Sequence, residues 1–325
     1  MNRHRAVGLA AITLTAVLWG TTGTAATFAP DVGPLAIGAA ALGIGGILQA
    51  VIAVPSLRRE ARPLRASAGT VALGAVCVAV YPLAFYSSMH LAGVAIGSVI
   101  SLASAPLASG VLERVVDGTP LNRWWVLSAL LGVTGSVMLC AATMDGGTGL
   151  SAATVWGVLL GLVAGGSYAG YSWAVHRLLG RGIGRGAAMG SVFGAGGALL
   201  MPVLLVTGAP LVASAQNVSV AVYMALVPMF CGYVLFGFGL TRVPASTATT
   251  VTLLEPAVAT VLAVLVVGER LSPLGWAGLV VIGAVLVVLA CAPTTTPQRG
   301  PAGTPGSAHL TAESPGAQLS TTVSR

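Results

Sequence analysis

Ten apolar segments of about twenty residues follow one another along the 325-residue chain, and this pattern restricts the fold more than any other feature. A helix needs about 20 predominantly apolar residues to cross the roughly 30 Å hydrocarbon core of a bilayer, because each residue adds 1.5 Å. The segments cover residues 6–27, 33–55, 68–88, 94–111, 124–142, 154–175, 186–206, 218–239, 245–267 and 274–291. The sequence therefore predicts an all-α integral membrane protein with ten transmembrane helices.

Charged residues are too scarce for a protein that folds in water. Asp, Glu, Lys and Arg make up 7% of the chain, whereas a soluble domain carries about 25%. The connections between the apolar segments are short, so no folded domain is expected outside the membrane. Residues 293–325 are rich in Pro, Gly, Ser and Thr and have too little apolar surface to fold, which predicts a disordered cytoplasmic tail.

The positions of the arginines predict the orientation of the chain. All 15 basic residues are arginine, and short cytoplasmic loops hold the excess of positive charge in membrane proteins. If ten spans follow a cytoplasmic N-terminus, Arg270, next to Glu269, is the one arginine outside. The net charge of +7 is thus explained by membrane topology and not by nucleic-acid binding.

The composition also indicates a cellular location. Lysine is absent while Ala, Gly and Val are abundant, which is typical of a GC-rich bacterial genome. We therefore expect a multi-pass protein of the bacterial cytoplasmic (inner) membrane, surrounded by the lipid bilayer and with both termini in the cytoplasm. No feature of the sequence indicates the oligomeric state.

The chain carries a weak internal repeat. A shift of 150 residues superimposes residues 91–121 on 241–271, so that Pro106 meets Pro256 and Gly118 meets Gly268. This predicts two five-helix repeats, over residues 1–145 and 150–292. Because five is an odd number, the second copy enters the membrane from the opposite side, and the repeats are inverted. Inverted repeats are a recurrent transporter architecture, although a duplication can also produce a stable bundle without transport.

Several short motifs resemble the drug/metabolite transporter superfamily and, within it, the EamA-type transporters. The motifs are Trp19-Gly20, the segment from Pro106 to Gly118, Leu254-Glu255-Pro256 and Gly268-Glu269-Arg270-Leu271. The resemblance covers nearly all of the chain up to Cys291; the first repeat departs from it with Asp117-Gly118-Thr119, where the family commonly has a glycine-glutamate pair. It implies a ten-helix carrier, usually an exporter of amino acids, metabolites or drugs, with a central cavity formed by both repeats.

Glu255 is the acid that the predicted spans place closest to the bilayer centre. It lies about nine residues into its span, or roughly 14 Å deep at 1.5 Å per residue. An ionised carboxylate at that depth costs several kcal/mol unless it is paired or hydrated, so Glu255 should face the interior of the bundle. One role is contact with a cationic part of the substrate or uptake of a driving proton. The other is structural, as a hydrogen bond to backbone that Pro256 frees.

Several aromatic residues lie well inside the predicted spans and not at the membrane interfaces. The candidates for lining a substrate pathway, together with Glu255, are Trp19, Tyr81, Phe85, Tyr86, Tyr168, Tyr171, Trp173 and Tyr233. Aromatic rings in a cavity offer stacking surface and, for tyrosine, a hydroxyl contact. Packing in the core is the competing explanation for each of them, because buried aromatic rings mostly fill space.

Five prolines within the predicted spans are candidates for helix kinks. They are Pro82, Pro106, Pro202, Pro228 and Pro256. A proline inside a helix removes one backbone donor and bends or breaks the helix, which exposes backbone polar groups toward a cavity.

The sequence lacks the motifs of enzymes and of ATP-driven pumps. No G-x-S-x-G, H-E-x-x-H or G-x-x-x-x-G-K-[ST] is present, and no catalytic residue, metal or cofactor is predicted. We expect a secondary-active transporter that exports a small metabolite, amino acid or drug-like molecule by alternating access, with proton coupling as one option. An importer or a flippase of lipid-linked substrates is the alternative within this class. A membrane-embedded enzyme or a non-transporting sensor is the alternative outside it.

Overall fold

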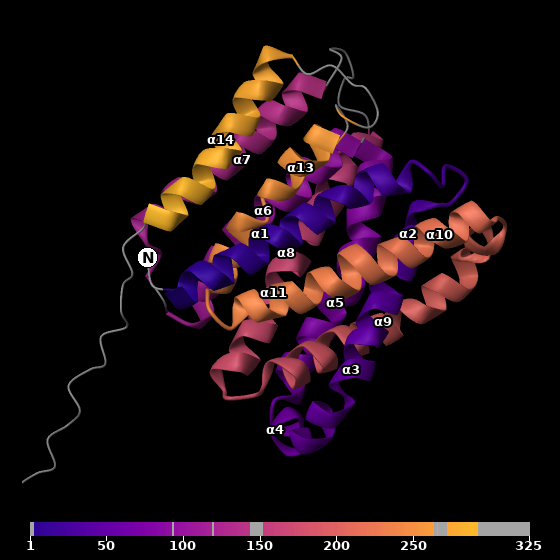
Figure 1. The fold of residues 1–325 in the computed structure, drawn as a ribbon, viewed down its shortest axis with the longest axis vertical. Helices are drawn as coiled ribbons and strands as arrows, with labels where there is room; N and C mark the ends of the chain where they lie inside the picture. The colour runs from indigo at the N-terminus through magenta and orange to yellow at the C-terminus, as the bar shows by residue number, and fades with distance from the viewer. Residues whose placement is uncertain are drawn as a thin grey trace, which may run out of the picture. The chain divides into compact units, whose positions relative to one another are not determined.

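The computed structural model describes residues 3–92, 94–118, 120–143, 152–262, 265 and 272–291, and this part of the chain is all-helical (Figure 1). The first half, which ends at Thr143, contains α1 (Arg3–Ala26), α2 (Pro34–Gly38), the π-helix η1 (Ala39–Ile44), α3 (Gly45–Arg59), α4 (Ala61–Ala66), α5 (Ala68–Ala92), α6 (Val94–Val116) and α7 (Arg123–Thr143). The second half, from Ala152, contains α8 (Ala152–Gly180), α9 (Arg185–Thr207), the 3-10 helix η2 (Ala209–Val212), α10 (Ala215–Met224), the π-helix η3 (Ala225–Cys231), α11 (Gly232–Leu240), α12 (Ala245–Val251), α13 (Leu254–Leu262) and α14 (Pro273–Cys291).

Six of the predicted spans correspond to helices that are long and apolar enough to cross a membrane. These helical stretches are Arg3–Ala26, Pro34–Arg59, Ala68–Ala92, Ala152–Gly180, Arg185–Thr207 and Ala215–Leu240. Large apolar side chains face outward from them, such as Val51, Ile52 and Leu205, as expected where lipid and not water is the solvent. The protein is therefore a multi-pass membrane protein.

The other four predicted segments stay predictions as membrane spans. Segments 94–111, 124–142 and 274–291 lie within α6, α7 and α14, and α12 and α13 cover most of segment 245–267. The predicted tail, Glu269 and Arg270 lie outside the described residues.

The two halves pack on each other through paired helices. Helix α1 packs on α11 and α13, and α8 packs on α5 and α6. Helix α3 packs on α9, and α7 lies beside α14, as Figure 1 shows at its upper left. The core of the described structure therefore lies between helices of the two halves.

Glycine allows the closest of these approaches. A Cβ atom on Gly46 of α3 would collide with the backbone oxygen of Phe193 in α9. In α1, a Cβ on Gly20 would lie 2.7 Å from the Cβ of Val258 and 3.0 Å from the backbone oxygen of Glu255. The absence of a side chain at Gly20 thus fixes how closely α13 approaches α1.

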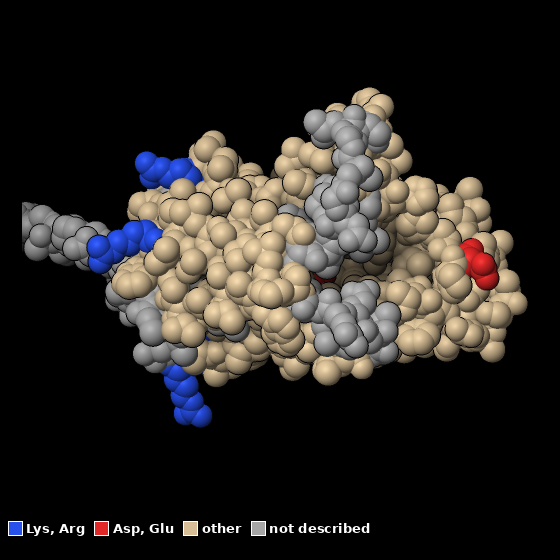
Figure 2. Space-filling model, turned by 90° about the horizontal axis from the view of Figure 1, so that it is seen from above, with Lys and Arg blue, Asp and Glu red and all other residues tan. Residues whose placement is uncertain are grey.

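The arginine-rich loops of both halves meet at one end of the bundle. Arg181 donates to the hydroxyl of Ser67 at 3.1 Å, and the Glu60 carboxylate accepts from the backbone N–H of Gly184 at 2.7 Å. Figure 2 shows arginine side chains at one end of the visible face and an acidic side chain toward the other. This is the charge distribution expected of a bundle that crosses a bilayer.

Candidate transport site between the two halves

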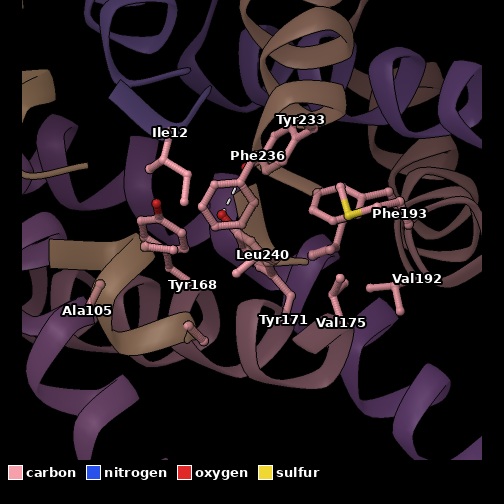
Figure 3. Close-up of a cluster of buried hydrophobic side chains, with 14 of the residues drawn as sticks. Ile12, Ala105, Tyr168, Tyr171, Val175, Val192, Phe193, Tyr233, Phe236 and Leu240 are labelled. Atoms are coloured by element: carbon pink, nitrogen blue, oxygen red, sulfur yellow. Dashed lines mark hydrogen bonds between the residues drawn. The ribbon is translucent and has the colours of Figure 1, made fainter. Parts of the chain in front are cut away.

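A cluster of aromatic rings occupies the contact between the halves. Its members come from α1, α5, α8, α9 and α11, and they are Trp19, Tyr81, Phe85, Tyr168, Tyr171, Phe193, Tyr233 and Phe236. Neighbouring ring centroids lie as close as 4.3 Å, between Phe193 and Tyr233, and 4.8 Å, between Trp19 and Tyr233. Figure 3 shows Tyr168 and Tyr171 of α8, Phe193 of α9, and Tyr233 and Phe236 of α11 pointing toward one another.

The polar atoms of this cluster are hydrogen-bonded across helices. The hydroxyls of Tyr171 and Tyr233 lie 2.9 Å apart, shown by the dashed line in Figure 3. The Tyr168 hydroxyl lies 2.7 Å from that of Thr252, and the indole N–H of Trp19 donates to the Pro228 carbonyl at 2.9 Å. Buried polar groups need such partners, so these bonds fix the orientation of the rings.

A cavity opens beside the cluster, and both halves line it. The first half contributes Trp19, Thr22, Gly38, Ala41, Leu42, Tyr81, Pro82, Phe85 and Tyr86, and the second contributes Met229, Tyr233 and Glu255. The centre of a water molecule fits in about 20 Å³ of this cavity. That is space for about one water molecule, so a larger ligand enters only if the lining side chains move.

Glu255 is the acidic group of the cavity lining. Its side chain is 8% exposed, and its Oε2 atom has no hydrogen-bond partner within the described part of the chain. An unpaired, buried carboxylate oxygen is costly in a low-dielectric interior. The Oε2 atom of Glu255 therefore gains no hydrogen bond from the described residues to offset its burial.

Glu255 follows a break in the ninth predicted span. Helix α12 ends at Val251, and the backbone then turns through tight bonds from Leu253 N to Thr250 O (3.2 Å) and from Glu255 N to Thr252 O (2.9 Å). In this turn the Thr250 hydroxyl bonds back to Ser246 O at 2.7 Å, and that of Thr252 to Thr249 O at 2.9 Å. Such side-chain bonds compete with helical backbone bonding and bend helices.

The described residues that line the cavity carry no positive charge. Its lining includes neither arginine nor histidine. In the described ranges, no three His, Cys, Asp or Glu side chains gather closely enough to hold a metal ion. A cation that pairs with Glu255 would therefore have to come from a ligand.

The predicted aromatic candidates fall into three groups. Trp19, Tyr81, Phe85, Tyr86 and Tyr233 lie on the cavity lining. Tyr168 and Tyr171 are fully buried behind that lining, within the aromatic cluster. Trp173 is separate from both, because its indole N–H donates to Asp117 at 2.7 Å and its ring packs under Arg177.

The five prolines also differ in their surroundings. Pro82, Pro106 and Pro202 lie inside the single helices α5, α6 and α9. Pro228 lies in the π-helix η3, and Pro256 lies in the first turn of α13. Two of the five thus accompany a departure from regular α-helix.

The two ends of the bundle differ in the contacts between the halves. At the arginine-rich end, Asp117 after α6 forms an ion pair with Arg177 of α8. Glu113 accepts from the backbone N–H and hydroxyl of Ser246, at 2.9 and 2.6 Å, and so caps α12. These contacts join the two halves at that end.

At the opposite end a wide pocket opens between α1 and α10. Its lining contains Thr21, Thr24, Ala25, Phe28, Gln216, Ser219, Val220, Tyr223 and Leu262, and the centres of water molecules fit in about 600 Å³ of it. Among the described residues, the contacts between the halves thus lie at the arginine-rich end, and the wide pocket lies at the other.

Sequence reasoning missed the threonines that shape the site. The run Thr247-Ala248-Thr249-Thr250-Val251-Thr252 is unusually rich in β-branched hydroxyl residues for the middle of an apolar segment. This enrichment is a signal that was present in the sequence. The partner of Thr252, Tyr168, is 84 residues away and has no such local signal.

Apolar spanning helices, a charged end, and a buried acid in a cavity between two halves together define a multi-pass membrane transporter. The EamA-like transporter family matches the chain twice, over residues 6–141 and 155–291. The chain belongs to this family, and it is a transporter and not an enzyme.

Individual proteins with similar sequences or folds agree with this assignment. The "Uncharacterized transporter YwfM" of Bacillus subtilis (strain 168) is 34% identical over 87% of this chain and 93% of its own. The "Probable terminal-alkyne amino-acid exporter" of Streptantibioticus cattleyicolor is 28% identical over 90% of this chain and 99% of its own. A crystal structure with 20% identity has a TM-score of 0.69, covers 86% of this chain and 94% of its own, and so shares the fold.

Proposed function

We propose that this protein is a secondary-active exporter of a small metabolite, amino acid or drug-like molecule, which works by alternating access of two inverted five-helix repeats. The observation that carries the proposal is the cavity around Glu255, which both halves line. A site shared by two similar halves of opposite orientation opens to each side in turn when the halves rock against each other.

The helix pairings support the inverted repeat. Numbered as ten spans, the third span of the first half packs on the first span of the second (α5 on α8), and the reverse pair is α1 on α11. The fourth-on-first pair, α6 on α8, likewise has its counterpart in α13 on α1. A two-fold axis between the halves would produce these exchanged pairs, and the double family match over 6–141 and 155–291 fits the same division.

We place the arginine-rich end in the cytoplasm of a bacterium, with both termini on that side. With this placement, the wide pocket between α1 and α10 faces outward. A reporter fused after Gly208 tests this orientation, since the ten-span topology puts that loop outside. Activity of a reporter that works only in the cytoplasm would overturn the topology.

Glu255 is our candidate for substrate binding or proton coupling. The structural alternative, a hydrogen bond from its carboxyl group to freed backbone, has no support from Oε2, which lacks a partner among the described residues. Its burial beside the cavity fits the functional role, because ionisable groups inside membranes mark substrate and proton pathways.

Counterflow in proteoliposomes tests the proposal. Vesicles with the purified protein are loaded with a mixed metabolite pool and diluted into labelled pool at two pH gradients, with protein-free vesicles as the control. We expect protein-dependent uptake of at least one solute and a rate that depends on the gradient. No exchange of any solute would contradict the carrier, and exchange at the same rate in both gradients would contradict proton coupling. An importer or a flippase of lipid-linked substrates would be recognised by the preferred direction or by a lipid-linked solute.

A further inference from the structure

This inference rests on the proposed function. The geometry points to a substrate that is a small organic amine without a carboxylate, and the ammonium group of this amine contacts Glu255. The cavity around Glu255 lacks the one partner that a buried carboxylate requires. Oε2 is unpaired, the side chain is more than nine-tenths buried, and the lining supplies no arginine or histidine. A ligand ammonium would provide both the missing charge and a hydrogen-bond donor.

The aromatic side chains that line the cavity would also attract a ligand ammonium group. Trp19, Tyr81, Phe85, Tyr86 and Tyr233 line it beside Glu255. The faces of aromatic rings carry negative charge density and attract ammonium groups, most strongly where water is excluded. Leu42, Pro82 and Met229 add apolar surface to the lining, which accommodates the hydrocarbon part of such an amine.

The lining offers a substrate carboxylate no cation, and the hydroxyls of Tyr81 and Tyr86 are neutral donors. The Trp19 indole N–H is already bonded to the Pro228 carbonyl, and the Thr22 hydroxyl to the Trp19 carbonyl at 2.7 Å. The Tyr233 hydroxyl is bonded to Tyr171. With no cation on the lining, an anion brought close to Glu255 would be repelled and left unpaired. The site therefore selects an amine over the corresponding amino acid.

Four probes of nearly the same size separate the possibilities. They are 2-phenylethylamine, phenylalanine, 3-phenylpropanoate and 2-phenylethanol, which carry a cation, both charges, an anion and no charge. Binding to the purified full-length protein in lipid nanodiscs is measured by calorimetry. We expect 2-phenylethylamine to bind at least about tenfold more tightly than each of the others. This is the ratio of dissociation constants that one charge-assisted hydrogen bond would produce.

Variants assign the discrimination to Glu255. Glu255→Gln should weaken 2-phenylethylamine binding by about tenfold or more and abolish its advantage over 2-phenylethanol. Glu255→Asp should retain part of the advantage of 2-phenylethylamine over 2-phenylethanol. The control Asp31→Asn, in the exposed loop after α1, should leave binding unchanged. Size-exclusion elution and thermal midpoint identify a variant that has not folded, in which case the four-probe comparison on the wild type decides alone.

The outcomes are distinguishable from those of the proposed function. Phenylalanine or 3-phenylpropanoate binding as tightly as the amine overturns this inference, as does amine binding that is absent at millimolar concentration or unchanged in folded Glu255→Gln. Amine binding without any counterflow contradicts the carrier and leaves the inference standing. Counterflow of an anionic solute that does not depend on Glu255 supports the carrier and overturns the inference.

Discussion

Pro106 lies inside α6, which runs as one helix from Val94 to Val116, whereas Pro256, its counterpart 150 residues later, follows the break between α12 and α13. The residue before each proline differs too. Ala105 is fully buried in the core, and Glu255 reaches the cavity with an unpaired oxygen. The two predicted repeats thus place an inert residue and an ionisable one at the same duplicated position.

The difference shows that a proline alone does not break a helix in this protein. The positions that match Thr250 and Thr252 are Ile100 and Leu102 in the first copy, which cannot bond to backbone carbonyls. Ser101 of α6 bonds back to Gly97 O at 2.7 Å, yet α6 stays unbroken. A cluster of threonines, one of them tied to Tyr168, accompanies the break that presents Glu255 to the cavity.

The largest effects on stability and transport are expected at the glycines that allow close packing against α13 and α6. Gly20→Ala places a Cβ 2.7 Å from Val258 and 3.0 Å from the Glu255 carbonyl, and Gly165→Ala places one 2.7 Å from the Ser101 carbonyl. Each should lower the free energy of unfolding by about 1–3 kcal/mol, since overpacking displaces a helix. Only Gly20→Ala should also reduce counterflow by more than about tenfold, because it displaces Glu255.

The control for this pair is Gly23→Ala, also in α1. A Cβ at Gly23 meets nothing within 4 Å, so its unfolding free energy should stay within about 0.5 kcal/mol of wild type. Equal losses of transport in Gly20→Ala and Gly165→Ala would mean that the position of Glu255 is not special.

Replacement of the two prolines should change the free energy of unfolding differently in the two repeats, with an effect of intermediate size. Pro106 lies in a helix interior, where alanine restores a backbone hydrogen bond, so Pro106→Ala should raise the free energy of unfolding by about 1–3 kcal/mol. Pro256 lies in the first turn of α13, where the N–H has no partner within the helix, so Pro256→Ala should change it by less than about 0.5 kcal/mol. Denaturant titration in detergent measures both. A gain in unfolding free energy that is larger for Pro256→Ala than for Pro106→Ala would show that Pro256 causes the break between α12 and α13.

Loss of the hydrogen bond between the Tyr168 and Thr252 hydroxyls should have the smallest effect on stability. Thr252→Val removes the bond to Tyr168 and should cost about 1 kcal/mol of unfolding free energy. A double-mutant cycle with Tyr168→Phe should give a coupling of about 0.5–1 kcal/mol. Ser101→Ala in α6 is the matched control, and a loss there as large as in Thr252→Val would remove the distinction between the copies.

Local sequence properties predicted much of the fold. The six confirmed apolar helices depend on length and hydropathy alone, which each segment carries by itself. The burial of Glu255 followed from its depth within a span. The grouping of the aromatic rings did not follow, because it depends on how each helix is rotated about its axis. Tyr81 therefore lines the cavity while Tyr168 lies behind it, and Trp173 turns toward Asp117, 56 residues away.

The central claim is that the cavity around Glu255, which both halves line, is the transport site. The most direct test is the initial rate of counterflow by wild type, Glu255→Gln and Asp31→Asn, reconstituted at equal protein content and compared for the same solute. We predict that Glu255→Gln reduces the rate by at least about tenfold while Asp31→Asn exchanges like wild type. Wild-type rates in folded Glu255→Gln would contradict the account.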